Sequence, residues 1–157
     1  MLSIDGWRAL GKVTVLAVAC LGSCPAADGE EVRVTVVAIL ATDQGKKVDQ
    51  ELQGIADEIR KKEPGLTGFR LGRMTRMPVN VGQKETFPLV DKEVAIVVVK
   101  HGANENNRVC LSVKPPQLGE ITYTTCCGKF FPIVTRYQTK DKERLIIAIR
   151  VQPCKEK

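Results

Sequence analysis

Four cysteines have a residue type and spacing that could support chemistry: Cys110, Cys126, Cys127 and Cys154. An even set of cysteines in an exported protein usually forms disulfides. A bond between the adjacent Cys126 and Cys127 is disfavoured, because neighbouring residues on a strand point to opposite faces. Cys110 and Cys154 are then each expected to join one member of that pair. Cys110–Cys126 is favoured if their strands are neighbours, since both lie opposite the apolar residues of their strands, and Cys127–Cys154 would then hold the C-terminus.

The same thiols, with His101, are also candidate metal ligands or redox groups. A structural zinc site usually contains a C-x2–4-C pair, because a short loop aims two sulfurs at one ion. The cysteines here are instead 16, 1 and 27 residues apart, counting from residue 110 through 126 and 127 to 154. We therefore expect no bound metal and no cofactor. Two alternatives stay open: a Cu(I) or redox site at Cys126–Cys127, and free thiols packed in a core.

Catalysis is not expected from the remaining polar residues. His101 is the single histidine, so no site can use two imidazoles, and it lies in a polar loop without a nucleophile motif beside it. The chain contains no phosphate-binding glycine loop, no G-x-G-x-x-G motif and no H-E-x-x-H motif. Most carboxylates lie among lysines, where solvated turns account for them better than a paired acid and base do. We expect the protein not to be an enzyme.

Basic residues provide a second candidate site. The chain has 24 Lys and Arg against 18 Asp and Glu, a net charge of +6. If the end of a predicted helix approaches the strand that follows it, six of these residues form one anion-binding surface: Arg60, Lys61, Lys62, Arg70, Arg73 and Arg76. Such a surface attracts anionic polysaccharide, lipid headgroups or an acidic protein, although a solvated helix end and a polar strand face are the alternative. Nucleic acid is not expected, because Phe69 is the one aromatic residue adjoining these side chains.

The first 26 residues have the pattern of a secretory signal peptide. Arg8 and Lys12 precede an apolar segment, residues 13–23, and small residues follow it. This segment is shorter than the roughly 20 residues that a transmembrane helix needs, so we expect cleavage after Ala26, no transmembrane helix in the mature chain, and export to the periplasm or beyond. Cleavage removes two basic residues and one acidic residue, which leaves a charge of +5 on residues 27–157. Residues 21–24 (LGSC) also resemble the lipobox of bacterial lipoproteins, which makes Cys24 a lipidation candidate in a second interpretation.

Residues 27–157 are expected to form a single α+β domain. The strand predicted at residues 32–41 is apolar on both faces over most of its length, so it should be central in a sheet or covered by a helix. Apolar residues share one face of an amphipathic helix predicted at residues 48–62. A strand is then predicted over residues 69–71 and 77–81, with a bulge or loop in the arginine-containing stretch between its two parts. Further strands are predicted at residues 86–90, 93–100, 108–113, 121–127, 131–137 and 144–151. This order predicts a mainly antiparallel β-sandwich or partial barrel of about seven to eight strands, with one helix packed against it.

Three segments resemble small exported, uncharacterised proteins of planctomycete-type bacteria: VRVTVVAILATD at residues 32–43, KKEPGLTGFRL at residues 61–71, and the segment that begins VKPPQ and ends IAIRV at residues 113–151. The resemblance covers residues 32–154 and implies export and a β-rich domain, without any catalytic residue. Residues 128–151 are also similar to the closing hairpin of secretin pore domains. That similarity implies an envelope protein that assembles into a pore or ring.

Together these observations predict a non-catalytic exported domain that binds another component of the cell envelope or surface, either a protein or an anionic molecule. Two other functions are kept as alternatives. One is a secretin-like assembly module of the cell envelope, and the other is a thiol- or metal-binding redox protein that uses Cys126 and Cys127. The oligomeric state does not follow from the sequence.

Overall fold

The computed structural model describes residues 30–154 of the chain. The signal peptide predicted at residues 1–26 and the lipidation candidate Cys24 lie outside the described residues. The start of the mature chain at residue 27 also lies outside them. The fold and the sites below therefore concern the predicted exported domain.

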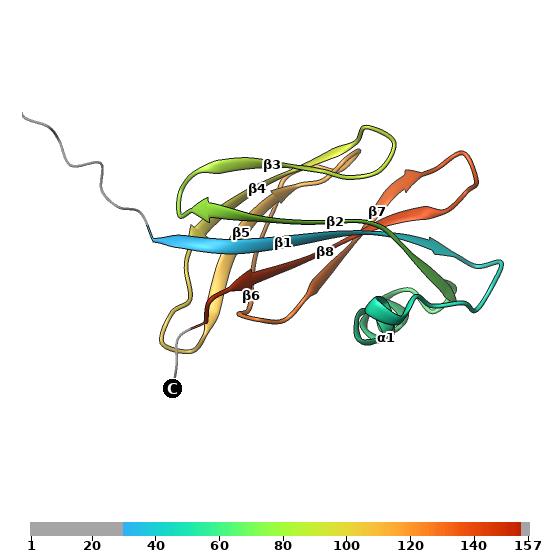
Figure 1. Ribbon diagram of the computed structural model, residues 1–157, viewed down its shortest axis with the longest axis horizontal. Helices are drawn as coiled ribbons and strands as arrows, with labels where there is room; N and C mark the ends of the chain where they lie inside the picture. Colours follow the sequence, from blue (N-terminus) through green and yellow to red (C-terminus); the bar gives the residue numbers. More distant parts are fainter. Residues whose placement is uncertain (1–29, 155–157) are drawn as a thin grey trace, which may run out of the picture.

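Residues 30–154 form eight strands and one α-helix. The strands make two four-stranded antiparallel sheets that pack face to face as a sandwich (Figure 1). Sheet A has the strand order β2-β1-β8-β7, and sheet B has the order β3-β4-β5-β6. The strand bounds are β1 (Glu31–Thr42), β2 (Gly68–Asn80), β3 (Lys84–Pro88), β4 (Val94–His101), β5 (Arg108–Lys114), β6 (Ile121–Cys126), β7 (Phe131–Gln138) and β8 (Arg144–Gln152). The predicted fold class is confirmed, and of its two forms the structure adopts the sandwich rather than the partial barrel.

β1 lies in the middle of sheet A and is buried on both faces, as its sequence predicts. Val34 and Val36 point toward sheet B and join the core between the sheets. Val37 and Ile39 point the other way and join a second core beneath the helix. Because a strand with two apolar faces must be covered on both, β1 specifies a three-layer arrangement of helix, sheet A and sheet B.

The helix begins later than its hydrophobic pattern predicts. α1 spans Gln53–Lys62 and follows a single 3-10 turn, η1 (Gln50–Leu52). The chain before it is extended, because Phe69 N donates to the carbonyl of Lys47 and Asp49 N donates to the carbonyl of Phe69. Leu52, Ile55 and Ile59 still pack against sheet A, so the predicted apolar face is the buried one. Within residues 30–154 no helix is long and apolar enough to span a membrane.

β2 is one continuous strand, and of the bulge or loop predicted between residues 71 and 77 the structure has the bulge. It pairs with β1 over its whole length, with a bulge between Ala38 and Ile39 of β1 opposite Gly72. A Cβ at Gly72 would lie 2.7 Å from Val90 Cγ1, so the side-chain-free residue allows this close approach. Residues 72–76 are mostly polar because β2 is an edge strand with an exposed side. They continue the strand and do not form a loop.

The core between the sheets supplies the first testable prediction. Ile147, in the middle of β8, has 0% exposed surface and packs in this core. We expect Ile147→Ala to lower the free energy of unfolding by about 2–5 kcal/mol, because it removes buried methylene groups and leaves a cavity. Urea denaturation measures the change.

Val94→Ala is the matched control for this substitution. Val94 is 42% exposed at the start of β4, so its truncation should change the stability by no more than about 0.5 kcal/mol. Equal losses from the two variants would contradict the assignment of Ile147 to the core.

Candidate functional site

One of the two predicted disulfides is present. Cys127 and Cys154 are bonded, with their Cα atoms 5.5 Å apart. The bond joins the turn that follows β6 to the segment that follows β8, and Gly128 N donates to the carbonyl of Val151 beside it. The disulfide therefore holds the end of β8 to the turn through which the chain passes from sheet B to sheet A.

The predicted Cys110–Cys126 disulfide is wrong, since both residues are free cysteines. They do lie on the same face of neighbouring strands, as expected, but the register offsets them by two residues. Cys110 is opposite Thr124, and Cys126 is opposite Arg108. Diagonal neighbours of this kind have Cα atoms about 7–8 Å apart, which is beyond the usual reach of a disulfide.

The cysteines do not assemble a metal or dithiol site in the described part of the chain. Cys127 is bonded to Cys154, so Cys126 has no thiol partner next to it in the sequence. Within residues 30–154 no three His, Cys, Asp or Glu side chains are grouped so that they could hold a metal ion. His101 is exposed at the end of β4, opposite Cys110 and next to a bulge, and no hydrogen bond joins it to this thiol.

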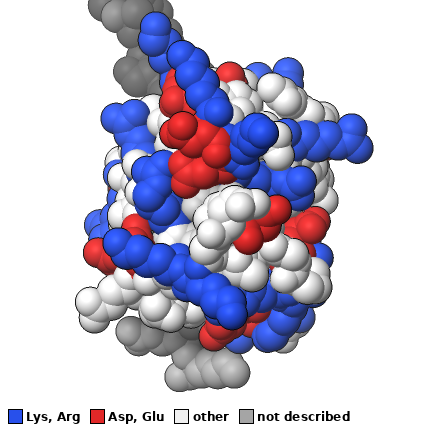
Figure 2. Space-filling model, turned by 90° about the vertical axis from the view of Figure 1, so that its right-hand side faces the viewer, with Lys and Arg blue, Asp and Glu red and all other residues white. Residues whose placement is uncertain are grey.

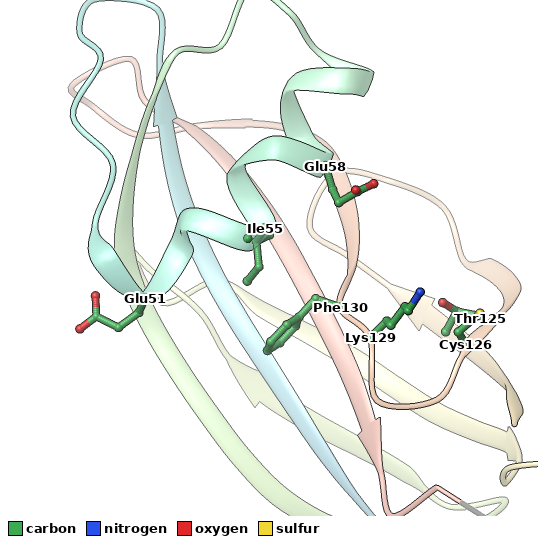
Figure 3. A pocket seen from close by; sticks show the side chains of 8 residues that line it. Glu51, Ile55, Glu58, Thr125, Cys126, Lys129 and Phe130 are labelled. Atoms are coloured by element: carbon green, nitrogen blue, oxygen red, sulfur yellow. The ribbon is translucent and has the colours of Figure 1, made fainter. Parts of the chain in front are cut away.

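Cys126 instead lines an open groove between α1 and the turn that follows β6 (Figure 3). The groove encloses about 580 Å³. Ile55 and Phe130 provide its apolar floor, and Glu58 and Lys129 lie at its rim. A hydrogen bond from Lys61 to Glu58 lowers the pKa of that carboxyl. Among residues 30–154 no hydrogen bond joins the Cys126 thiol in the groove to a base.

Three of the six predicted anion-binding residues lie at the end of α1, where they make ion pairs or hydrogen bonds within the protein. Arg60 pairs with Asp57 at 3.2 Å, and Lys61 pairs with Glu58 at 2.7 Å. Lys62 donates to a backbone carbonyl of β7 and lies 4.3 Å from an aromatic ring centroid. Figure 2 views this end of the molecule and shows Lys and Arg interspersed with Asp and Glu rather than gathered in one patch.

The other three lie on β2 and do not share one face. Arg70 makes two hydrogen bonds to Glu143, one at 2.6 Å and one at 3.2 Å, and this carboxylate raises the pKa of the guanidinium. Arg73 is opposite a β1 residue whose side chain faces sheet B. Arg76 is opposite Thr35, which lies on the other face of sheet A. The six predicted residues therefore lie in three places: at the end of α1, on the side of β2 that carries Arg70 and Arg73, and on its other side at Arg76. Arg76 belongs to the cluster described next.

A cluster of arginines lies on the outer face of sheet A, beyond the part that α1 covers. Arg76 of β2, Thr35 of β1 and Arg150 of β8 are direct neighbours across three strands. Arg33 is two residues from Thr35 on β1, so it points to the same face. Because adjacent strands are about 4.8 Å apart, the three guanidinium groups project from a region only about 10 Å wide. We call Arg33, Arg76 and Arg150 the arginine face.

The arginine face has no carboxylate partner among residues 30–154. Arg76 Nε donates to Thr35 Oγ1 at 3.3 Å, and Thr35 is 1% exposed. The guanidinium carbon of Arg150 lies 4.6 Å from the ring centroid of Phe130, and its Nε is buried without a hydrogen-bond partner. Arg33 makes no ion pair with any described residue. Glu31 lies two residues away on the same face of β1 but does not pair with it.

The surroundings of the arginine face are open. An open hollow of about 720 Å³ begins beside it and is lined in part by Arg33, Pro78 and Gln152. Met74, the next outward-facing residue of β2, is 45% exposed between the arginine face and the helix. A ligand can therefore lie across the strands without displacing any part of the described protein.

Sequence reasoning found Arg76 and missed Arg33 and Arg150. These three residues are far apart in the chain, and the strand register alone brings them together. Comparison with protein-family models, with curated proteins and with solved structures found no match, so the resemblances noted from the sequence remain predictions and the site is interpreted from its own geometry.

Proposed function

We propose that this protein is a non-catalytic exported domain that binds an anionic polysaccharide of the cell envelope or surface through its arginine face. The observation that carries the proposal is the row Arg76–Thr35–Arg150, with Arg33 beside it, in which three guanidinium groups have no carboxylate partner among the described residues. Export is supported by the signal-peptide pattern of residues 1–26. A disulfide is also typical of proteins from oxidising compartments.

The arrangement of these three arginines is energetically unfavourable in the protein alone. Three like charges within about 10 Å repel one another, and a partly buried cation without an acceptor loses hydration that nothing in the protein replaces. A guanidinium presents planar N–H donors that match sulfate, phosphate and carboxylate groups in two-point contacts. An anion bound here would offset both the repulsion and the lost hydration.

The shape of the surface favours an extended ligand. Arg33, Arg76 and Arg150 project from a sheet and not from a deep pocket, and the hollow beside Arg33 continues the surface at one end. A polysaccharide with repeated charges can contact all three groups at once. Nucleic acid is disfavoured because it usually needs several exposed rings for base stacking, whereas the ring beside the arginine face, Phe130, is half-buried and contacts Arg150. No observation on residues 30–154 specifically favours the redox or secretin-like alternatives.

A binding measurement with matched variants tests this function. We expect the purified protein to bind heparin, a sulfated polysaccharide, with an affinity that falls as sodium chloride rises, because ion contacts release counterions. Arg33→Gln and Arg76→Gln should each weaken binding about three- to tenfold and reduce the slope of log affinity against log salt by about one. Isothermal titration at several salt concentrations measures both quantities.

Arg108→Gln is the control for the charge itself. Arg108 is exposed on β5, in the opposite sheet, so its removal lowers the net charge equally without touching the arginine face. The proposal is overturned if the unaltered protein does not bind heparin, or if Arg108→Gln weakens binding as much as the two face variants do.

Thermal unfolding gives an independent prediction. A ligand that binds the folded protein alone stabilises it by about 2.7 kcal/mol at one hundred times its dissociation constant. Heparin at that excess should raise the midpoint of thermal unfolding of the unaltered protein and of Arg108→Gln. At the same heparin concentration the Arg33→Gln/Arg76→Gln double variant, which should bind about 9- to 100-fold more weakly, should gain only about 0.4–1.5 kcal/mol and show a clearly smaller shift. An equal shift in all three proteins would contradict the assignment.

A further inference from the structure

One member of the arginine face, Arg150, contacts an aromatic ring, and the role inferred for this contact rests on the proposed function. We propose that Phe130 is a positioning residue that holds the Arg150 guanidinium ready for an oxyanion, and that the Cys127–Cys154 disulfide keeps Phe130 in place. Affinity for anionic polysaccharide then depends on an aromatic ring and on a disulfide that do not themselves contact the ligand.

Phe130 and Arg150 are neighbours across β7 and β8. Phe131 is opposite Ile149 in this pair of strands, so Phe130, just before β7, is opposite Arg150. The guanidinium carbon lies over the ring, 4.6 Å from its centroid, which is within the distance of a cation–π contact. The row on the outer face of sheet A therefore continues across all four strands, from Arg76 through Thr35 and Arg150 to Phe130.

The contact with the ring satisfies none of the N–H groups of the Arg150 guanidinium with a hydrogen bond. No carboxylate or carbonyl of residues 30–154 is hydrogen-bonded to these groups, and the Nε atom is buried without a partner. A planar donor set held in this way suits two-point contact with a sulfate, phosphate or carboxylate group. Because its orientation is already restricted, Arg150 loses less conformational freedom on binding than a solvated arginine would.

Arg150 differs in this respect from the two other arginines. Arg33 is exposed and has neither a ring contact nor an ion pair among the described residues. Arg76 is exposed and is attached through one hydrogen bond to Thr35. Arg150 is half-buried against Phe130, so it is the member of the face whose geometry is set before the ligand arrives.

The position of Phe130 is set by the turn in front of it. Cys127 N donates to the carbonyl of Asn107 at 2.7 Å, and Gly128 N donates to the carbonyl of Val151 at 3.0 Å. The disulfide adds a covalent link from this turn to Cys154. It joins the two strand ends that carry Phe130 and Arg150, since Cys127 is three residues before the ring and Cys154 is four residues after the guanidinium.

Gly128 shows how closely the turn fits the disulfide. Its φ of +81° lies in the left-handed region that favours glycine, and a Cβ at this position would lie 3.2 Å from Cys154 Sγ. On the far side of the turn, Phe130 packs in the core beneath α1 and lines the groove with Ile55 (Figure 3). The ring is thus held by the helix on one side and by the disulfide-linked turn on the other.

A double-mutant cycle tests the positioning role. We expect Phe130→Leu to weaken heparin binding about three- to tenfold, whereas Phe130→Tyr, which keeps the aromatic face, should bind as the unaltered protein does. In an Arg150→Gln background the effect of Phe130→Leu should disappear, because the group that the ring orients is gone. Isothermal titration at a fixed low salt concentration measures the four affinities of the cycle and the affinity of Phe130→Tyr.

The disulfide is tested by the Cys127→Ser/Cys154→Ser double variant, with Cys126→Ser as the adjacent free-thiol control. The double variant should bind heparin about three- to tenfold more weakly while retaining the circular dichroism of the β-sandwich, and the control should bind normally. Normal heparin binding by the folded double variant would overturn the role of the disulfide, and the cycle at Phe130 tests the role of the ring independently of it.

The outcomes separate the two proposals. Failure of the unaltered protein to bind heparin overturns the proposed function itself. Normal binding by the unaltered protein together with normal binding by Phe130→Leu overturns the positioning role and leaves the function standing. An equal loss from Phe130→Leu in the presence and absence of Arg150 also overturns it, because that result would show a structural effect unrelated to the guanidinium.

Discussion

The structure depends on the requirement that β1 be covered on both faces. Alternate residues of this strand face sheet B and the helix, and most of them are completely buried. Its backbone pairs with β2 on one side and with β8 on the other, so β1 also has no free edge. A strand that is buried on both faces and paired on both edges over most of its length fixes the position of its neighbours, and the helix and the second sheet follow as the layers needed to exclude water from it.

The helix covers only part of the outer face of sheet A, and the residue types change where the cover ends. Val37, Ile39 and Ala41 of β1 lie beneath α1, whereas Arg33 and Thr35 lie beyond it. The same change occurs on β8, where Ile146 and Ala148 give way to Arg150 and Gln152. Figure 1 shows α1 toward the end of β1, well away from the start of the strand. The boundary between apolar and polar residues therefore crosses neighbouring strands at one level and marks the arginine face.

Features with a local cause could be predicted from the sequence. The helical spacing of the apolar residues Leu52, Ile55 and Ile59 predicted the helix. The apolar residues on both faces of β1 predicted a covered central strand. The exclusion of an adjacent disulfide left two pairings, and Cys127–Cys154 was favoured only as the complement of a Cys110–Cys126 bond that does not form. These predictions hold because periodicity and strand geometry act over a few residues or, for the disulfide, because few pairings exist.

Features that depend on the strand register could not be predicted in the same way. Cys110 and Cys126 share a face, but a shift of two residues between β5 and β6 separates them. The start of the helix moved because the chain at residues 47–49 pairs with β2, which is a contact between distant segments. Arg33, Arg76 and Arg150 come from three strands, so no local pattern connects them. Register is set by the hydrophobic faces of paired strands and by their turns, and a one-residue change would move each arginine to the opposite face.

Thr35 explains how sheet A tolerates this concentration of charge. A guanidinium at its position would lie directly between those of Arg76 and Arg150, and an apolar residue would leave Arg76 Nε without the hydroxyl acceptor that it now has. A small β-branched alcohol suits the strand, accepts one hydrogen bond and separates Arg76 from Arg150. Phe130 separates and covers the other side of Arg150 without adding an opposing charge. Neutral groups thus flank the cation that is most buried, and its charge is left for a partner from outside the domain.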